Sequence, residues 1–177
     1  GVTLNGAVNV GTNNVDITFD TFAATTDTVT FTTSQTITAA NLDVSGTGSE
    51  DVINVTTNPI NVTGSVSLDT AGTIDVDQSV TGGTSVTLSG STVELKGGIT
   101  VTAAGGNLDI YDTGTVTGIT LDGTGSSTVT LQTTTANGNV LLAGVTGNAA
   151  SHDLDILSTE GVTLNGAVNV GTNNVDI

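Results

Sequence analysis

The first seventeen residues of the chain recur at its other end. Residues 1–17 read GVTLNGAVNVGTNNVDI and residues 161–177 read the same, so the offset is 161 − 1 = 160 residues. Chance does not produce a match of this length. The chain therefore divides into one complete repeat, residues 1–160, and the start of the next, residues 161–177. Repetition at this length is typical of proteins that are built to be long.

The composition favours strands and turns over a wide globular core. Valine and threonine prefer extended strands, whereas asparagine, aspartate and the 24 glycines prefer turns. Three Phe and one Tyr are the only aromatic residues, so a narrow core of Val, Ile and Leu is expected. Cysteine is absent, which excludes disulfides and thiolate metal sites within this sequence.

A triplet of one apolar, one polar or small, and one apolar residue recurs along the chain. Alternate side chains of a strand face opposite ways, so each apolar pair should point inward and the middle residue outward. The seven steps from Val15 to Val175 add up to 160 residues, which predicts seven turns of about 23 residues per repeat. The triplets are Val15/Ile17, Leu42/Val44, Val66/Leu68, Val86/Leu88, Leu108/Ile110, Val129/Leu131, Leu154/Ile156 and Val175/Ile177.

Two further apolar series lie between the triplets, which predicts three short strands per turn. A looser series runs from Val8/Val10 to Val168/Val170, and a second series lies 12 or 13 residues before each triplet, at Val2, Val29, Ile53, Ile74, Leu95, Val116, Leu141 and Val162. Stacked turns of this kind form an all-β solenoid with three parallel sheets, about 34 Å long for seven turns at about 4.8 Å each. An antiparallel β-sandwich is the alternative, and the scarcity of two-residue hairpin turns argues against it.

Several segments resemble the repeats of filamentous-haemagglutinin-like bacterial surface proteins. They are GGNLDIYDTGTVTG at residues 105–118, GNVLLAG at residues 138–144 and EGVTLNGAVNV at residues 160–170. The resemblance implies a right-handed parallel β-helix in a secreted or surface-attached fibre. It also implies an extracellular or cell-surface location and a role in adhesion or matrix formation.

The few basic residues argue against an enzyme. Polysaccharide-processing enzymes share this fold, and their chemistry needs paired or metal-bound carboxylates beside a cationic group. The chain has no Arg, and its one Lys and one His are Lys96 and His152. We expect Lys96, on the same outer face as Glu94, to form a charge pair across turns, and His152 to lie on a turn surface.

Aspartates occupy the middle of several triplets. Asp16, Asp43, Asp109 and Asp155 should form an outward ladder along one face. Such a ladder keeps the surface soluble, and alternatively offers weak Ca²⁺ sites, because Ca²⁺ prefers carboxylate oxygens. No strong calcium-binding motif is present, so no cofactor is required.

The net charge constrains the partners. Residues 1–160 contain 16 acids and one Lys, a net charge of −15. Spread over about 34 Å, this is one negative charge per about 2.3 Å, which excludes nucleic acid as a partner. No run of 18 apolar residues occurs, so no membrane span is expected in this segment.

Three connections are longer than the others: residues 20–27, 45–51 and 132–139. We expect all three at the same corner, where loops on a rigid scaffold often form binding surfaces. Glycans or a host or neighbouring cell surface are the expected ligands. The candidate contact residues are Asp20, Phe22, Asp27, Glu50 and Asp51.

These observations favour a non-enzymatic structural repeat of a long extracellular fibre that serves as a spacer, coat or matrix. Its partners would be copies of the same repeat, end to end and side by side, either in one covalent array or as stacked subunits. The alternative is an adhesin segment that binds through the long loops. An ice-binding surface, suggested by TVTFTTSQT at residues 28–36, and an enzyme rank below both.

Overall fold

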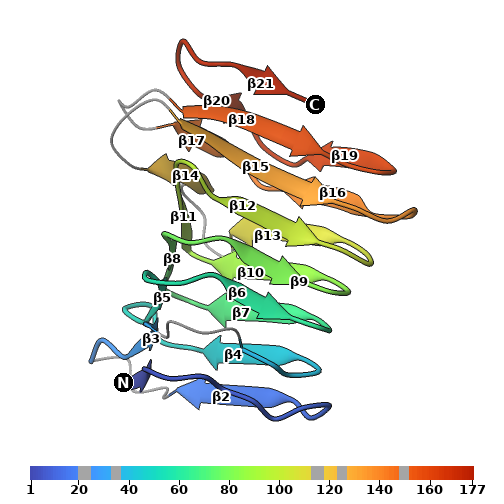
Figure 1. Cartoon of the computed structure of the whole chain (residues 1–177). Helices are drawn as coiled ribbons and strands as arrows, with labels where there is room; N and C mark the ends of the chain where they lie inside the picture. The colour runs from blue at the N-terminus through green and yellow to red at the C-terminus, as the bar shows by residue number, and fades with distance from the viewer. Residues whose placement is uncertain (20–24, 33–36, 113–117, 123–126, 148–151) are drawn as a thin grey trace.

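The computed structural model describes residues 1–19, 25–32, 37–112, 118–122, 127–147 and 152–177. The described residues form no helix, and their regular structure consists of strands in three parallel sheets. The turns are stacked along one axis from the N-terminus to the C-terminus (Figure 1). The predicted all-β solenoid with three strands per turn is confirmed.

We number the three sheets in the order in which the chain first reaches their sides. Sheet 1 contains β1 (Val2–Leu4), β3 (Thr28–Phe31), β5 (Val52–Val55), β8 (Thr73–Val76), β11 (Thr92–Lys96), β14 (Ile119–Asp122), β17 (Val145–Gly147) and β20 (Val168–Asn169). Sheet 2 contains β6 (Ile60–Val62), β9 (Val80–Gly82), β12 (Thr100–Ala103), β15 (Ser127–Thr133), β18 (His152–Leu157) and β21 (Val175–Asp176). Sheet 3 contains β2 (Val15–Phe19), β4 (Leu42–Gly46), β7 (Val66–Thr70), β10 (Val86–Gly90), β13 (Leu108–Asp112), β16 (Asn139–Leu142) and β19 (Gly161–Leu164).

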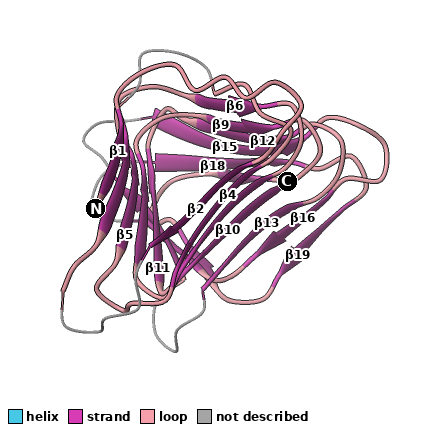
Figure 2. Ribbon diagram, turned by 90° about the horizontal axis from the view of Figure 1, so that it is seen from below, coloured by secondary structure: helices cyan, strands magenta, loops and turns pink. Residues whose placement is uncertain are grey.

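The three sheets form the sides of a triangle when the molecule is seen from its N-terminal end (Figure 2). In that view the chain passes from sheet 1 to sheet 2 to sheet 3 in clockwise order while it moves away from the viewer. This is the sense of a right-handed coil. In the first two turns the described residues of the second side contain no named strand, and an isolated bridge pairs Asn9 with Thr38 there.

The core is a narrow column of stacked aliphatic side chains. In sheet 3, Leu88 lies between Leu68 on the preceding turn and Ile110 on the following one, and none of the three side chains is exposed to solvent. The residues between these inward positions face outward, as the alternation predicts. All three sheets contribute side chains to this column, and each fully buried leucine or isoleucine stabilises the coil by about 1.5–3 kcal/mol.

The corners bring backbone against backbone. A Cβ atom at Gly64 would lie 1.8 Å from the carbonyl oxygen of Ala40 on the preceding turn, so no larger residue fits there. Beside it, the amide of Asn41 donates to the side-chain oxygen of Asn14 at 3.0 Å, and the oxygen of Asn41 accepts from the hydroxyl of Ser65 at 2.8 Å. Stacked polar side chains thus connect successive turns at this corner, as expected for Asn and Ser in register.

The predicted register is wrong after β13, because the triplets do not stay on one sheet. Leu108 and Ile110 lie in β13 on sheet 3, whereas Val129 and Leu131 lie in β15 on sheet 2. The cause is β14, which was expected in the looser series but pairs with β11 on sheet 1. Val116, the expected member of that sheet, lies outside the described residues.

The repeat therefore does not contain a whole number of turns. β1 and β19 are formed by the same residues of the two copies. β1 lies on the first side of the first turn, and β19 lies on the third side of the seventh turn. The two strands are therefore six whole turns and two further sides apart. The 160-residue offset thus corresponds to 20 sides, or 6⅔ turns, with 160 ÷ 6⅔ = 24 residues per turn. At about 4.8 Å per turn, one repeat extends about 32 Å along the axis.

Candidate functional surfaces

The aspartate ladder is divided between two sheets. Asp16 and Asp43 are paired neighbours on the exposed face of sheet 3. Asp109 lies on the same sheet three turns beyond Asp43, because Ser67 and Thr87 occupy the intervening turns. The prediction that one continuous face carries all four aspartates is therefore wrong, since the triplets change sheet after β13.

Asp155 lies on sheet 2, apart from the other three candidates, with Thr130 on one side and Asp176 on the other. Among the residues that the structure describes, no group of three or more His, Cys, Asp or Glu side chains could hold a metal ion. A pair of adjacent exposed carboxylates, such as Asp16 and Asp43, attracts cations as a charged surface.

Asp109 has one unexpected neighbour, Leu141. Asp109 lies between Thr87 and Leu141 on the outer face of sheet 3. Leu141 was expected to point inward, but it faces outward and is partly exposed, while Val140 and Leu142 are buried beside it. Burial raises the pKa of the Asp109 carboxyl above its ordinary value.

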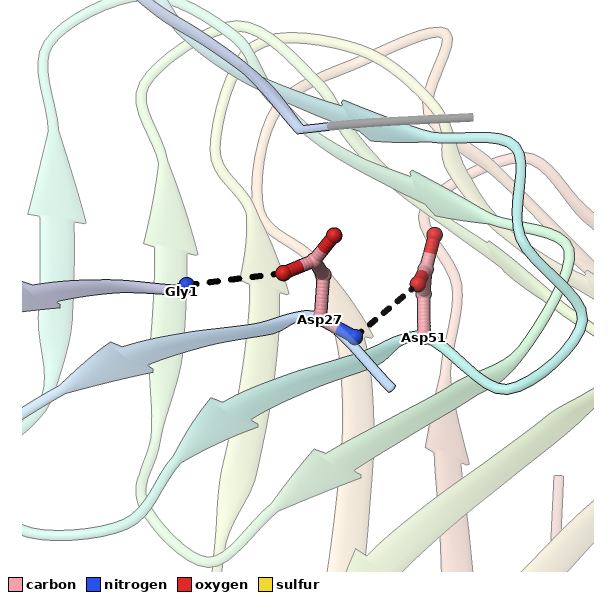
Figure 3. Close-up of polar contacts among 3 residues, drawn as sticks. All are labelled: Gly1, Asp27 and Asp51. Atoms are coloured by element: carbon pink, nitrogen blue, oxygen red, sulfur yellow. Dashed lines mark hydrogen bonds and ion pairs between the residues drawn. The ribbon is translucent and has the colours of Figure 1, made fainter. Parts of the chain in front are cut away.

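Asp51 joins two turns at the corner between sheets 3 and 1. One carboxylate oxygen accepts a hydrogen bond from the backbone N–H of Gly48 at 2.8 Å, and the other accepts from the N–H of Asp27 at 3.2 Å. The carboxylate of Asp27 in turn lies 3.4 Å from the amino group of Gly1 (Figure 3). Asp51 is only 1% exposed, and its carboxylate satisfies two backbone donors at this corner, which is a structural role.

The other candidate loop residues differ in exposure. Glu50 is exposed beside Asp51, Asp27 is partly buried, and Asp20 and Phe22 lie outside the described residues. The segments at residues 20–27 and 45–51 both connect sheet 3 to sheet 1, as predicted. The segment at residues 132–139 connects sheet 2 to sheet 3 at another corner, so the expected grouping of all three loops is wrong. The reason is again that β15 belongs to sheet 2.

Four acids surround Lys96 on the outer face of sheet 1. The Lys96 ammonium lies 3.0 Å from the Asp77 carboxylate of the preceding turn. The predicted charge pair across turns is thus confirmed, and its partner, which the sequence did not identify, is Asp77. Glu94 and Asp75 are paired neighbours on β11 and β8, and Asp122 is aligned with Lys96 on β14.

Burial and the neighbouring acids raise the pKa of Asp75 and of Glu94. For Asp75 the largest cause is burial, followed by repulsion from Asp77 and Asp122, against which Lys96 acts in the opposite sense. The pair of Lys96 and Asp77 is solvent-exposed, so its contribution to stability is small, about 0–1 kcal/mol. The cluster is thus a strongly acidic patch of four carboxyl groups around the ammonium group of Lys96.

A pocket of about 480 Å³ opens at the C-terminal end of the coil, between β18 and β19. Its apolar lining comes from Ile156, Leu157, Val162 and Ile177. Leu157 and Ile177 are 51% and 71% exposed, respectively, so the end of the core is open here. His152 was expected on a turn, but it is the first residue of β18 and is aligned with Ser127 on the preceding turn.

No known protein family, curated protein or solved structure matches the chain. In the part of the chain that the structure describes, no helix is long and apolar enough to cross a membrane. The fold, the repeat and the chemistry of the surfaces are thus the grounds for a functional proposal.

Proposed function

We propose that this chain is a non-enzymatic structural repeat of a long extracellular bacterial fibre, in which it acts as a rigid spacer, coat or matrix element. The observation that carries the proposal is that the same sequence occupies both ends of the coil. The first copy forms β1, which pairs with β3, and the second copy forms β19, which pairs with β16, so both copies are built into the same parallel coil.

The internal structure supports stiffness along the axis. From β7 to β18, each named strand of the coil pairs with the strand of the turn before and with that of the turn after. Contacts therefore run from turn to turn without interruption, as in other solenoids, where stability is a sum of terms between neighbours. A coil of this kind becomes longer with every added copy and keeps the same cross-section.

The surface charge supports a fibre that stays separate from its neighbours. A net charge of −15 over about 32 Å corresponds to one negative charge per about 2.1 Å. Parallel rods of this charge repel one another within a Debye length, about 8 Å at physiological ionic strength. The bacterial origin and the extracellular location rest on the resemblance to filamentous-haemagglutinin-like repeats in segments such as residues 105–118 and 160–170.

Electron microscopy of chains with two, four and eight copies of the 160-residue repeat tests the proposal. We expect rods of constant width whose length increases by about 32 Å per copy. Compact particles, or lengths that do not depend on the number of copies, would contradict the proposal. A chain of the same length whose inward leucines are replaced by Asp in one copy serves as the control, because that copy should interrupt the rod.

A further inference from the structure

The two copies of the repeated sequence lie on different sides of the coil. Residues 2–4 form β1 on sheet 1, whereas residues 161–164 form β19 on sheet 3. Likewise β2 begins at Val15 on sheet 3, and its counterpart β21 begins at Val175 on sheet 2. Each element of the second copy is thus displaced by one side against the direction in which the chain winds.

The local structure of the two copies is nevertheless the same. The N–H of Gly11 donates to the side-chain oxygen of Asn9 at 3.1 Å, and the N–H of Gly171 donates to that of Asn169 at 3.1 Å. Both glycines have a positive φ, 62° and 70°, which a residue with a side chain rarely adopts. In the first copy this turn is the corner between sheets 2 and 3, and in the second copy it is the corner between sheets 1 and 2. The same sequence therefore forms an equivalent corner at two places on the triangle.

The open C-terminal end shows what a continuation would cover. β21 is aligned with β18 so that Val175 pairs with Leu154 and Asp176 with Asp155. In the first copy the same sequence continues with Thr18 and Phe19, and Phe19 is only 6% exposed at the end of β2. The same two residues after Ile177 would extend β21, and the alternation would turn the aromatic ring inward beside the 480 Å³ pocket.

We propose that copies joined through the shared seventeen residues form one continuous coil in which each copy is rotated by one third of a turn relative to the copy before it. The inference rests on the proposed fibre function and adds the geometry of the array. Three copies complete 3 × 6⅔ = 20 whole turns, or about 96 Å, before any surface feature returns to the same side. A fibre of this kind presents each patch, such as the acidic patch around Lys96, on all three sides in turn. Its lateral partners are parallel fibres, and any of its three sides can contact them, because the same patches recur on each side.

Pairs of labels in a four-copy chain test the rotation. The chain has no cysteine, so replacing the exposed Asp43 by Cys in two chosen copies gives two attachment points for gold nanocrystals. X-ray scattering interference then measures the distance between labels on copies one and two, one and three, and one and four. We expect the distance from copy one to copy four to be about 96 Å. We also expect the distance from copy one to copy two to exceed one third of it, since those labels lie on different sides.

Distances in the ratio 1:2:3 would place all labels on one line and would overturn the rotation while leaving the fibre proposal intact. If the distances do not increase with copy number, the fibre proposal fails and the rotation fails with it. The exposed Asp16, replaced by Cys in the same copies, is a matched second position, because it lies beside Asp43 on the preceding turn and must give the same pattern.

A disulfide test in the 177-residue chain checks the change of sheet that causes the rotation. Thr100 and Thr130 are paired neighbours on the outer face of β12 and β15. Thr100→Cys with Thr130→Cys should therefore form a disulfide under mild oxidation, because neighbouring strands bring Cα atoms into the required range of about 4.4–6.8 Å. If the repeat contained seven whole turns, Asp109 and Thr130 would be neighbours on one sheet, and Asp109→Cys with Thr130→Cys would form the disulfide instead. Cross-linking in this second pair and not in the first would overturn the proposal.

Discussion

Leu88 is the residue whose truncation tests the packing of the core most directly. Its side chain is fully buried between Leu68 and Ile110, and hydrogen-bonded turns above and below limit how far the site can collapse. Leu88→Ala removes three carbon atoms, which corresponds to a loss of about 2.4 kcal/mol in transfer free energy. With the cavity left behind, we expect the free energy of unfolding to fall by about 3–5 kcal/mol.

Thr87 provides the matched control, because it is the preceding residue of the same strand and faces outward. Thr87→Ala should change the free energy of unfolding by no more than about 0.5 kcal/mol. Denaturation with guanidinium chloride measures both variants. Since each turn contacts mainly its neighbours, native-state hydrogen exchange should show the effect of Leu88→Ala first in β7, β10 and β13.

Two results would refute this reasoning. An equal loss of stability in both variants would mean that the alternation of inward and outward residues in β10 is wrong. Faster exchange spread evenly over all strands in Leu88→Ala would mean that the coil unfolds as one unit and that its stability is not a sum of contacts between neighbouring turns.

Three other predictions concern charge. The pKa values of Asp75, Glu94 and Asp109 are raised in the folded state, so the folded state binds protons at a higher pH than the unfolded state does. The free energy of unfolding should therefore increase as the pH is lowered from 7 toward the ordinary pKa values of 3.8 for Asp and 4.5 for Glu. Asp109→Asn should weaken this dependence in thermal unfolding measured against pH. Asp51→Ala should cost about 1–3 kcal/mol in thermal unfolding, because two backbone N–H groups lose their acceptor, whereas Asp43→Ala should be nearly neutral. Millimolar Ca²⁺ should promote bundling of multi-copy fibres in light scattering more than NaCl at the same ionic strength, and equal action of the two salts would remove the metal from the description.

Sequence patterns alone predict the fold class and the inward positions of most strands. From β4 to β13 the triplets identify buried residues of sheet 3, because the two apolar side chains of a triplet point to the same face of the strand. The pairing of Asp16 with Asp43 follows from the same alignment. Local alternation is therefore sufficient to find strands and the direction of their side chains.

The sheet to which each strand belongs could not be predicted in the same way. Leu108/Ile110 in β13 and Val129/Leu131 in β15 have the same pattern, yet they lie on different sheets. All three sheets enclose the same aliphatic column, so the triplet carries no information about which side it occupies. The buried role of Asp51 was also missed, because it depends on the N–H groups of Gly48 and Asp27, which the fold brings together.

The way the turns are joined also determines how the coil responds to a pulling force. Hydrogen bonds between sheet neighbours run along the axis, and the outermost turn is held on one side only. Tension on the ends should therefore unravel the coil one turn at a time. Each turn of 24 residues adds about 80 Å of extended chain in place of about 4.8 Å of axial length. In the fibre that we propose, complete unravelling of the turns thus corresponds to an extension of about seventeen-fold.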